Sequence, residues 1–139
     1  MKTILLIDDC VDYREITANL LMDEGYDVFE AANPMEALPM LEAEEFDLIV
    51  CDLHMPFTSG EAQNSFVYSY EVGVKTIQEL RDVFPKIPII AMSNTSTADL
   101  RKISQYLHPI PAYTKPTHNQ AVLEIIETHL TSPIAAIIQ

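Results

Sequence analysis

The sequence predicts a three-layer α/β fold: a doubly wound, five-stranded parallel sheet with helices on both faces. The main observation is that short, apolar, β-branched runs alternate five times with segments whose apolar residues recur at helical spacing. Strands that alternate with helices form parallel sheets, and right-handed crossovers place the helices on both faces. The length of 139 residues suits a single domain with a substantial core.

The five predicted strands are short apolar runs bounded by polar or turn-forming residues. They cover residues 3–7 (TILLI), 27–31 (DVFEA), 47–51 (DLIVC), 87–92 (IPIIAM) and 110–113 (IPAY). Continuous apolar runs of this length are typical of strands buried on both faces. The sheet therefore accounts for most of the expected core.

The five predicted helices follow the strands and carry recognisable end signals. Apolar residues at helical spacing span 13–21, 74–84, 100–107 and 122–129, and the second helix is expected to begin at Pro34. Gly25 is expected to stop the first helix, and Asn33 to cap the second with Glu36 completing a capping box. Pro39 is expected to kink or shorten that second helix, because it cannot donate a backbone hydrogen bond. Thr97 is expected to cap the fourth helix.

The charge and composition restrict the classes of function. A net charge of −13, with 8 Lys+Arg against 21 Asp+Glu, argues against direct binding of nucleic acid. No apolar stretch approaches the roughly 20 residues that span a bilayer, and the first residues do not form a signal peptide. Two cysteines, Cys10 and Cys51, are too few for a disulfide framework. These observations predict a cytoplasmic protein with no membrane contact.

Polar residues follow four of the five predicted strands at the point where each strand ends. They are Asp8 and Asp9 after the first strand, Asp52 after the third, Ser93 after the fourth and Lys115 after the fifth. Binding sites in open α/β sheets form at these carboxyl ends. A single aspartate in such a place is usually a cap or turn residue, but this ordered combination on four strand ends favours a functional site.

The expected chemistry of this site is metal-assisted phosphoryl transfer. Three neighbouring carboxylates repel one another and require a cation, and carboxylate ligands without a His/Cys pattern suit Mg²⁺. A carboxylate also acts as a nucleophile that forms an aspartyl-phosphate. Asp52 is the candidate nucleophile, and Ser93 and Lys115 are the candidate ligands of the phosphoryl oxygens.

Four motifs resemble the receiver domain of two-component response regulators, of the CheY-like chemotaxis-regulator type with a flavodoxin-like fold. They are LLIDD (5–9), DLIVCDLHMP (47–56), IIAMS (89–93) and YTKP (113–116). The resemblance covers essentially the whole chain. It implies that Asp52 is the phosphoacceptor, and that Mg²⁺ is bound by Asp8, Asp9, Asp52 and the backbone carbonyl of His54.

The same resemblance implies a conformational switch. Ser93 matches the hydroxyl residue that shifts to bind the phosphoryl group, and Lys115 matches the lysine that pairs with it. Tyr113 matches the aromatic residue that turns inward on phosphorylation. That movement would change the surface formed by the fourth helix, the fifth strand and the fifth helix.

Three departures from the family pattern affect the expected behaviour. The stretch 61–73 (EAQNSFVYSYEVG) is an apparent insertion before the third helix, and its alternating aromatics predict extended chain. It is interpreted either as a tolerated loop or as a lid or aromatic partner surface. Asn94 stands where the family usually has a small residue, and His54 occupies a position that tunes hydrolysis.

Residues 1–131 are predicted to form one receiver domain, followed by an apolar tail, 132–139.

The predicted function is that of a receiver that accepts a phosphoryl group and is not an enzyme in the turnover sense, since it catalyses only its own phosphorylation and dephosphorylation. The expected partners are a histidine kinase or histidine phosphotransfer protein and a downstream protein, with a phosphorylation-dependent homodimer left open. The alternative is a receiver-like interaction scaffold that signals without phosphorylation. An aspartyl phosphatase is set aside, because such enzymes typically carry a second Asp two residues after the nucleophile, where this chain has His54.

Overall fold

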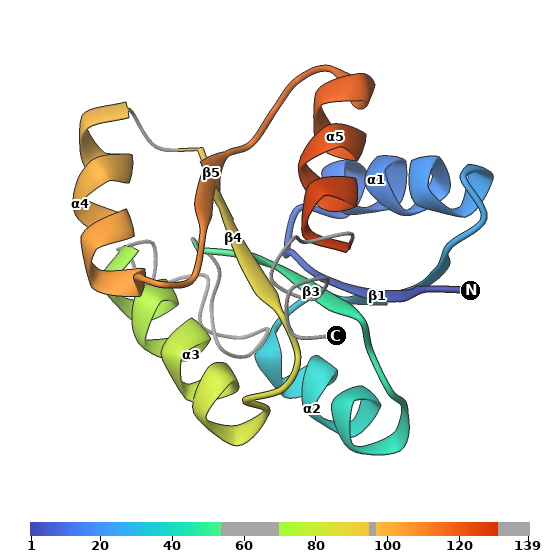
Figure 1. The fold of residues 1–139 in the computed structure, drawn as a ribbon, viewed down its shortest axis with the longest axis horizontal. Coiled ribbons are helices and arrows are strands. Elements are labelled where there is room, and N and C mark those ends of the chain that lie inside the picture. The colour runs from blue at the N-terminus through green and yellow to red at the C-terminus, as the bar shows by residue number, and fades with distance from the viewer. Residues whose placement is uncertain (54–69, 95–96, 131–139) are drawn as a thin grey trace.

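The computed structural model describes residues 1–53, 70–94 and 97–130, apart from the side chains of residues 70–72 and 97. Five strands alternate with five helices over these residues (Figure 1). The strands are β1 (Thr3–Ile7), β2 (Asp27–Ala31), β3 (Leu48–Asp52), β4 (Ile89–Ser93) and β5 (Ala112–Thr114). The helices are α1 (Val11–Asp23), α2 (Pro34–Ala43), α3 (Tyr70–Val83), α4 (Thr97–Leu107) and α5 (Asn119–Leu130).

The strands form one parallel sheet in the order β2-β1-β3-β4-β5, which confirms the predicted doubly wound α/β fold. Helices α2, α3 and α4 bury their apolar residues against one face of the sheet. Helices α1 and α5 pack together on the other face (Figure 1). Alternate residues of each buried strand belong to these two apolar layers, so the core is divided by the sheet.

The strand boundaries agree closely with the sequence for β1 and β2 and differ slightly for the others. Strand β3 is shifted by one residue, so that Asp52 is its last residue. Strands β4 and β5 each begin two residues later than predicted, directly after Pro88 and Pro111. A proline has no N–H to donate to the ladder, so each of these strands starts at the first residue that can both donate and accept a backbone hydrogen bond.

The end signals of α1 and α2 act largely as expected. Gly25 follows α1 with a φ of 93°, the left-handed region that favours glycine. The Asn33 side chain caps α2 by accepting a hydrogen bond from the Glu36 N–H at 3.0 Å, whereas the Glu36 carboxylate accepts from the Ala32 N–H at 2.9 Å. Pro39 does not end the helix, which continues to Ala43 because Ala37 and Leu41 are buried on its inner face.

Helix α3 begins earlier than the sequence predicts. Residues 70–73, the last part of the predicted insertion, are helical and not extended. Gly73 is required there, because a Cβ at this position would overlap the backbone of Leu53, the residue after Asp52. The first turn of α3 is thereby packed directly against the end of β3. The remainder of the insertion, 61–69, and the tail, 132–139, lie outside the described residues.

Candidate phosphoacceptor site

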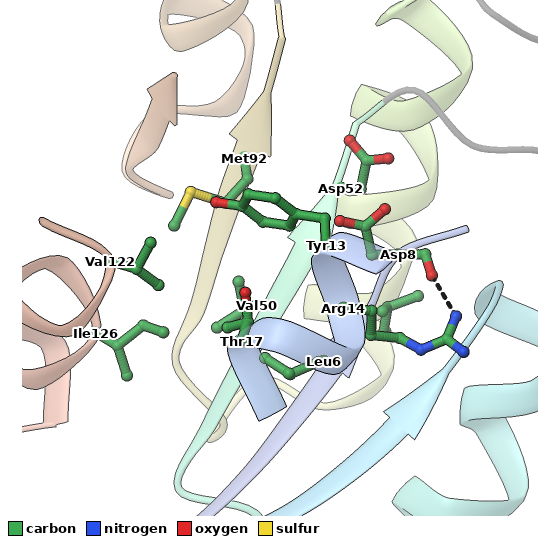
Figure 2. Close-up of a pocket in the computed structure, with 11 residues that line it drawn as sticks. Leu6, Asp8, Tyr13, Arg14, Thr17, Val50, Asp52, Met92, Val122 and Ile126 are labelled. Carbon is green, nitrogen blue, oxygen red and sulfur yellow. Dashed lines mark hydrogen bonds between the residues drawn. The ribbon is translucent and has the colours of Figure 1, made fainter. Parts of the chain in front are cut away.

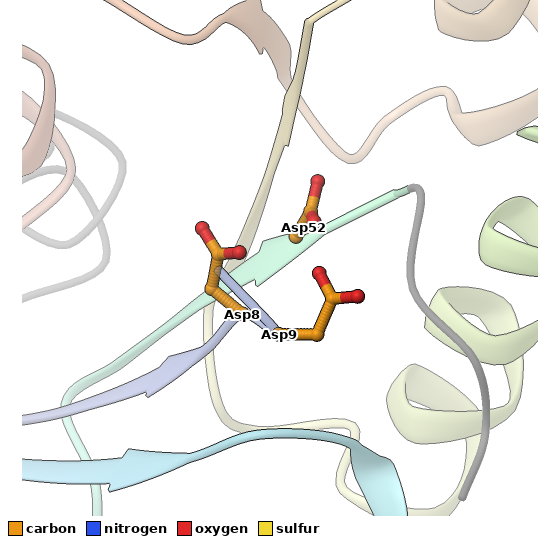
Figure 3. Close-up of side chains that lie close together, drawn as sticks. All are labelled: Asp8, Asp9 and Asp52. Atoms are coloured by element: carbon orange, nitrogen blue, oxygen red, sulfur yellow. The ribbon is translucent and has the colours of Figure 1, made fainter. Parts of the chain in front are cut away.

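Three aspartates converge at the carboxyl ends of β1 and β3, which are neighbouring strands (Figure 3). The pairing of Ile7 with Cys51 sets Asp8 level with Asp52, the last residue of β3. One carboxylate oxygen from each of Asp8, Asp9 and Asp52 lies within 4.8 Å of the other two. Asp8 and Asp52 are buried, whereas Asp9 faces solvent. The sheet register therefore builds the acidic cluster that the sequence predicts.

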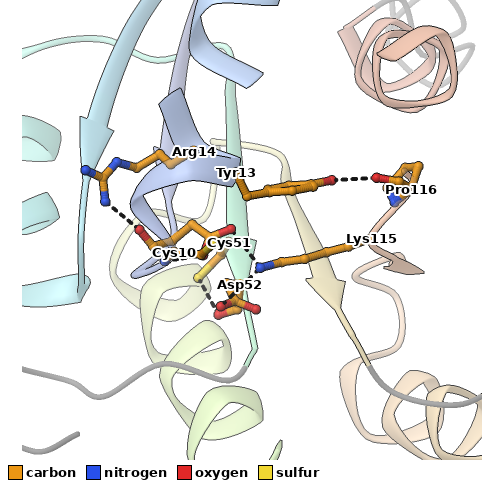
Figure 4. Close-up of polar contacts among 8 residues, drawn as sticks. Cys10, Tyr13, Arg14, Cys51, Asp52, Lys115 and Pro116 are labelled. Carbon is orange, nitrogen blue, oxygen red and sulfur yellow. Dashed lines mark hydrogen bonds and ion pairs between the residues drawn. The ribbon is translucent and has the colours of Figure 1, made fainter. Parts of the chain in front are cut away.

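Lys115 is the cation that pairs with two of these aspartates, and Figure 4 shows its ammonium directed at Asp52. Its Nζ lies 2.9 Å from Asp8 Oδ2 and 3.5 Å from Asp52 Oδ2, and only 6% of its side chain is exposed. The Lys115 N–H donates to the carbonyl of Ser93 at 2.8 Å, which ties the segment after β5 to the end of β4. Burial alone would lower the pKa of Lys115, but the charges of Asp52 and Asp8 outweigh it and raise that pKa.

The charges of the cluster do not cancel. Three carboxylates and one ammonium leave a formal charge of −2 (1 − 3) when all are ionised. Partial desolvation raises the pKa of Asp9, and the charge of Asp8 raises it further, whereas the charge of Lys115 lowers it. A divalent cation bound by oxygen ligands would balance the remaining charge, and the carboxylates fit Mg²⁺ in both chemistry and spacing.

Comparison with known proteins gives the family of this fold and site. A family model, the response regulator receiver domain, matches residues 4–65. Sporulation initiation phosphotransferase F of Bacillus subtilis is 23% identical over 129 residues, which cover 93% of this chain and 94% of that protein. Transcriptional regulatory protein ZraR of Klebsiella oxytoca is 30% identical over 96 residues, but the match covers only 19% of its length.

A solved structure supports the same assignment. The response regulator TrrA from Thermotoga maritima, determined in complex with Mg²⁺-BeF, superimposes with a TM-score of 0.68 at 26% identity, covering 93% of this chain and 99% of that one. This chain belongs to the response regulator receiver family. Receivers are signalling domains of phosphorelays, and the acidic cluster fits a phosphoacceptor site. No helix in the described part of this receiver is long and apolar enough to cross a membrane.

The other predicted site residues of the receiver differ in their surroundings. Ser93 ends β4 and is fully buried, one residue beyond Met92, the partner of Asp52 in the sheet. Asn94 follows it and is exposed. His54 lies outside the described residues, so its carbonyl and side chain stay predictions.

Tyr113 and Ser93, the two residues of the predicted switch, lie on opposite faces of the sheet. Tyr113 pairs with Met92 and packs against the apolar layer of α1 and α5. Because side chains alternate along a strand, Ser93 points to the opposite face from Met92 and Tyr113. The Tyr113 hydroxyl lies 2.6 Å from His129 Nε2 of α5, and the two rings meet edge to face. The structure thus connects Tyr113 with α5.

Two residues next to the acidic cluster were not singled out as site residues by the sequence. The Arg14 guanidinium donates to the carbonyl of Asp8 at 2.7 Å and binds Glu30 at 3.1 Å. Tyr13 lines a small cavity beside Asp8 and Asp52, and its ring lies near Lys115 (Figure 2; Figure 4). Tyr13 and Arg14 stand four and five residues after Asp9, in the first turns of the helix that follows β1. This short distance from the aspartates is the signal that would have identified them as site residues.

Cys51, the residue before Asp52, is not arranged as a reactive group. Cys51 is fully buried on the face opposite Asp52, where it packs with the apolar layer of α2, α3 and α4. Burial raises the pKa of its thiol well above the ordinary value, which disfavours the reactive thiolate. Cys51 therefore acts as a small apolar residue of the core.

Proposed function

We propose that Asp52 is the phosphoacceptor of this receiver and takes a phosphoryl group from a phosphohistidine on a histidine kinase or a histidine phosphotransfer protein. A carboxylate oxygen of Asp52 bonds to phosphorus as the phosphorus–nitrogen bond breaks. The imidazole leaves with the bonding electron pair and takes up a proton. The observation that carries the proposal is the pairing of the buried Lys115 ammonium with both Asp8 and Asp52.

Lys115 has two tasks in this proposal. Before transfer, its ammonium neutralises part of the charge of Asp52. After transfer, it binds a phosphoryl oxygen, because the same ammonium lies within reach of any group attached to Asp52. The Ser93 hydroxyl is proposed to donate to a second oxygen from the end of β4. Asp8, Asp9 and Asp52, with the carbonyl of His54, would hold Mg²⁺, which neutralises charge on the phosphoryl oxygens.

The aspartyl-phosphate is proposed to be removed by the receiver itself, without turnover of any other substrate. Water attacks phosphorus, the bond to Asp52 oxygen breaks, and inorganic phosphate leaves. Asn94 is exposed directly after Ser93, where it would control the access of water or of the donor. His54 is proposed to tune the same step.

The output is proposed to be a protein partner whose binding surface changes with phosphorylation. Since Tyr113 contacts α5, a switch through this residue would act through His129. A phosphorylation-dependent homodimer and a cytoplasmic location also stay predictions. The scaffold alternative has no observation in its favour, since Asp8, Asp52 and Lys115 are assembled as a phosphoacceptor site requires.

The test is phosphorylation by a small donor. We expect wild type incubated with Mg²⁺ and acetyl phosphate to gain the mass of one phosphoryl group by intact mass spectrometry, and Asp52→Asn to gain none. Asp47→Asn is the matched control, because Asp47 directly precedes β3 and binds the Thr3 N–H instead of the site. An equal gain in Asp52→Asn would move the acceptor to another residue. The absence of any gain or beryllofluoride response in wild type would revive the scaffold alternative.

A further inference from the structure

Tyr13 is the side chain that joins helix α1 to the segment carrying Lys115. It is the third residue of α1, and its hydroxyl donates to the carbonyl of Pro116 at 3.3 Å (Figure 4). Its ring centroid lies 4.9 Å from Lys115 Nζ. One side chain therefore contacts both Lys115 and Pro116, which are more than a hundred residues away in the sequence.

These two contacts constrain Lys115 in different ways, one through the backbone that follows it and the other through its ammonium. The bond to Pro116 fixes the backbone directly after Lys115. The aromatic face attracts the ammonium, because the ring carries negative charge density above its plane, and this attraction grows when water is excluded. Lysine has a long stem with many rotamers, so a fixed ammonium needs such contacts in addition to its carboxylate partners.

A purely structural role explains these contacts less well. The buried residues of α1 are Thr17, Ala18 and Leu21, whereas Tyr13 is only half-buried and lies at the end of the helix nearest the site. An apolar side chain would fill the same space beside Val122 and Met92 in the cavity of Figure 2. It would not bind the Pro116 carbonyl or attract an ammonium.

We propose that Tyr13 is a positioning residue that aims the Lys115 ammonium at the phosphoryl group on Asp52. Its ring would hold the ammonium while Lys115 exchanges a carboxylate oxygen for a phosphoryl oxygen, and its hydroxyl would limit the movement of the backbone that carries the lysine. Tyr13 would thus set how fast Asp52 is phosphorylated and how tightly a phosphoryl analogue binds. This inference rests on the proposed function of Asp52.

Two substitutions separate the two contacts. Tyr13→Phe keeps the ring and removes the bond to Pro116, whereas Tyr13→Leu removes both. We expect Tyr13→Leu to reduce the rate of phosphorylation by acetyl phosphate and the affinity for beryllofluoride by about 3- to 10-fold, the range of a partly desolvated cation–π contact. Tyr13→Phe should lose about twofold, in keeping with one long hydrogen bond.

The matched control is Tyr26→Phe. The Tyr26 hydroxyl also joins distant parts of the chain, since it donates to Glu127 of α5 at 3.0 Å, but it lies away from the acidic cluster. Its loss should leave both readouts within experimental error of wild type. Urea unfolding of every variant would show that each one folds, and Tyr13→Phe keeps the test usable should Tyr13→Leu be unstable.

A double-mutant cycle decides between positioning and mere packing. In a Lys115→Met background there is no ammonium to aim, so Tyr13→Leu should have no further effect on beryllofluoride affinity. An unchanged loss in that background, or wild-type behaviour of Tyr13→Leu itself, would overturn the inference. Failure of the proposed function looks different, because wild type itself would then neither gain phosphate nor respond to beryllofluoride.

Discussion

Two tyrosines on the same side of the sheet, Tyr13 and Tyr113, show how sequence distance and contact differ in this receiver. Tyr113 stands two residues before Lys115, yet its hydroxyl is directed to His129 of α5. Tyr13 stands 102 residues before Lys115 (115 − 13), yet its ring lies against the lysine ammonium. Tyr113, which is near Lys115 in the sequence, contacts α5. Tyr13, which is distant from Lys115 in the sequence, contacts the lysine in the site.

The difference follows from strand alternation and strand ends. Within β5, Tyr113 takes a face of the sheet and packs with the layer of α1 and α5. Lys115 directly follows β5, where its backbone N–H still bonds to the carbonyl of Ser93, and its long side chain reaches across to Asp8 and Asp52. Tyr13 begins its helix at the same carboxyl edge, and this places it beside the lysine. The two tyrosines should therefore contribute to different properties.

The largest expected effect is on stability, and it should come from Tyr113. Tyr113→Ala removes a ring that packs against the buried apolar layer and meets His129 edge to face, so we expect a loss of about 2–3 kcal/mol in the free energy of unfolding. Tyr13→Leu keeps most of its apolar volume and should lose less than about 1.5 kcal/mol. Urea denaturation measures both.

Tyr106→Ala provides the control for this first prediction. Tyr106 is 62% exposed, and its removal should change the free energy of unfolding by no more than about 0.5 kcal/mol. A larger loss for Tyr13→Leu than for Tyr113→Ala would reverse the comparison. It would mean that Tyr13 contributes mainly to the stability of the core and less to the position of Lys115.

An intermediate effect is expected on signalling within the receiver. Tyr113→Phe removes only the hydroxyl, so phosphorylation by acetyl phosphate should stay within about twofold of wild type. Beryllofluoride should shift the ring resonances of His129 in wild type and shift them less in Tyr113→Phe, because the hydroxyl contacts the His129 ring directly. Nuclear magnetic resonance of the His129 ring measures this response. Equal shifts in both proteins would show that the switch does not pass through Tyr113.

The sequence predicted the sheet and the acidic cluster well because both follow from local rules. Apolar runs mark the strands, and parallel pairing brings Asp8 and Asp52 together once β1 and β3 are neighbours. The starts of β4 and β5 were missed by two residues, although Pro88 and Pro111 mark them. The start of α3 was missed because it depends on a tertiary contact, the close approach of Gly73 to Leu53.

The contacts of the two tyrosines were beyond the sequence for a related reason. Matching YTKP to the family placed Tyr113 near the lysine, but a motif match does not say which face of β5 the ring occupies. The side is decided by where the ladder begins after Pro111, and a shift of one residue moves every side chain to the other face. The helical spacing of Tyr13 predicts only which face of α1 the residue occupies. It does not predict contacts with Lys115 and Pro116, which follow β5.

The smallest expected effect is a pH dependence of stability at His129, the partner of Tyr113. Burial lowers the pKa of His129 from its ordinary value of 6.5. The unfolded chain then binds more protons than the folded one between the lowered pKa and 6.5. His129 therefore contributes stability that is present above pH 6.5 and is lost as the pH falls through that window. The effect is small because the imidazole is only half-buried.

The Tyr113 hydroxyl determines whether the pKa of His129 rises or falls in Tyr113→Phe. We expect it to donate to the neutral ring of His129 at Nε2, a bond that favours the uncharged form. Tyr113→Phe should then raise the pKa of His129 toward 6.5, as measured by titration of its ring resonances, whereas Tyr13→Phe should leave it unchanged. A fall of that pKa in Tyr113→Phe would mean that the hydroxyl accepts a bond from a protonated ring, and the Tyr113 contact would then strengthen in acid instead of weakening.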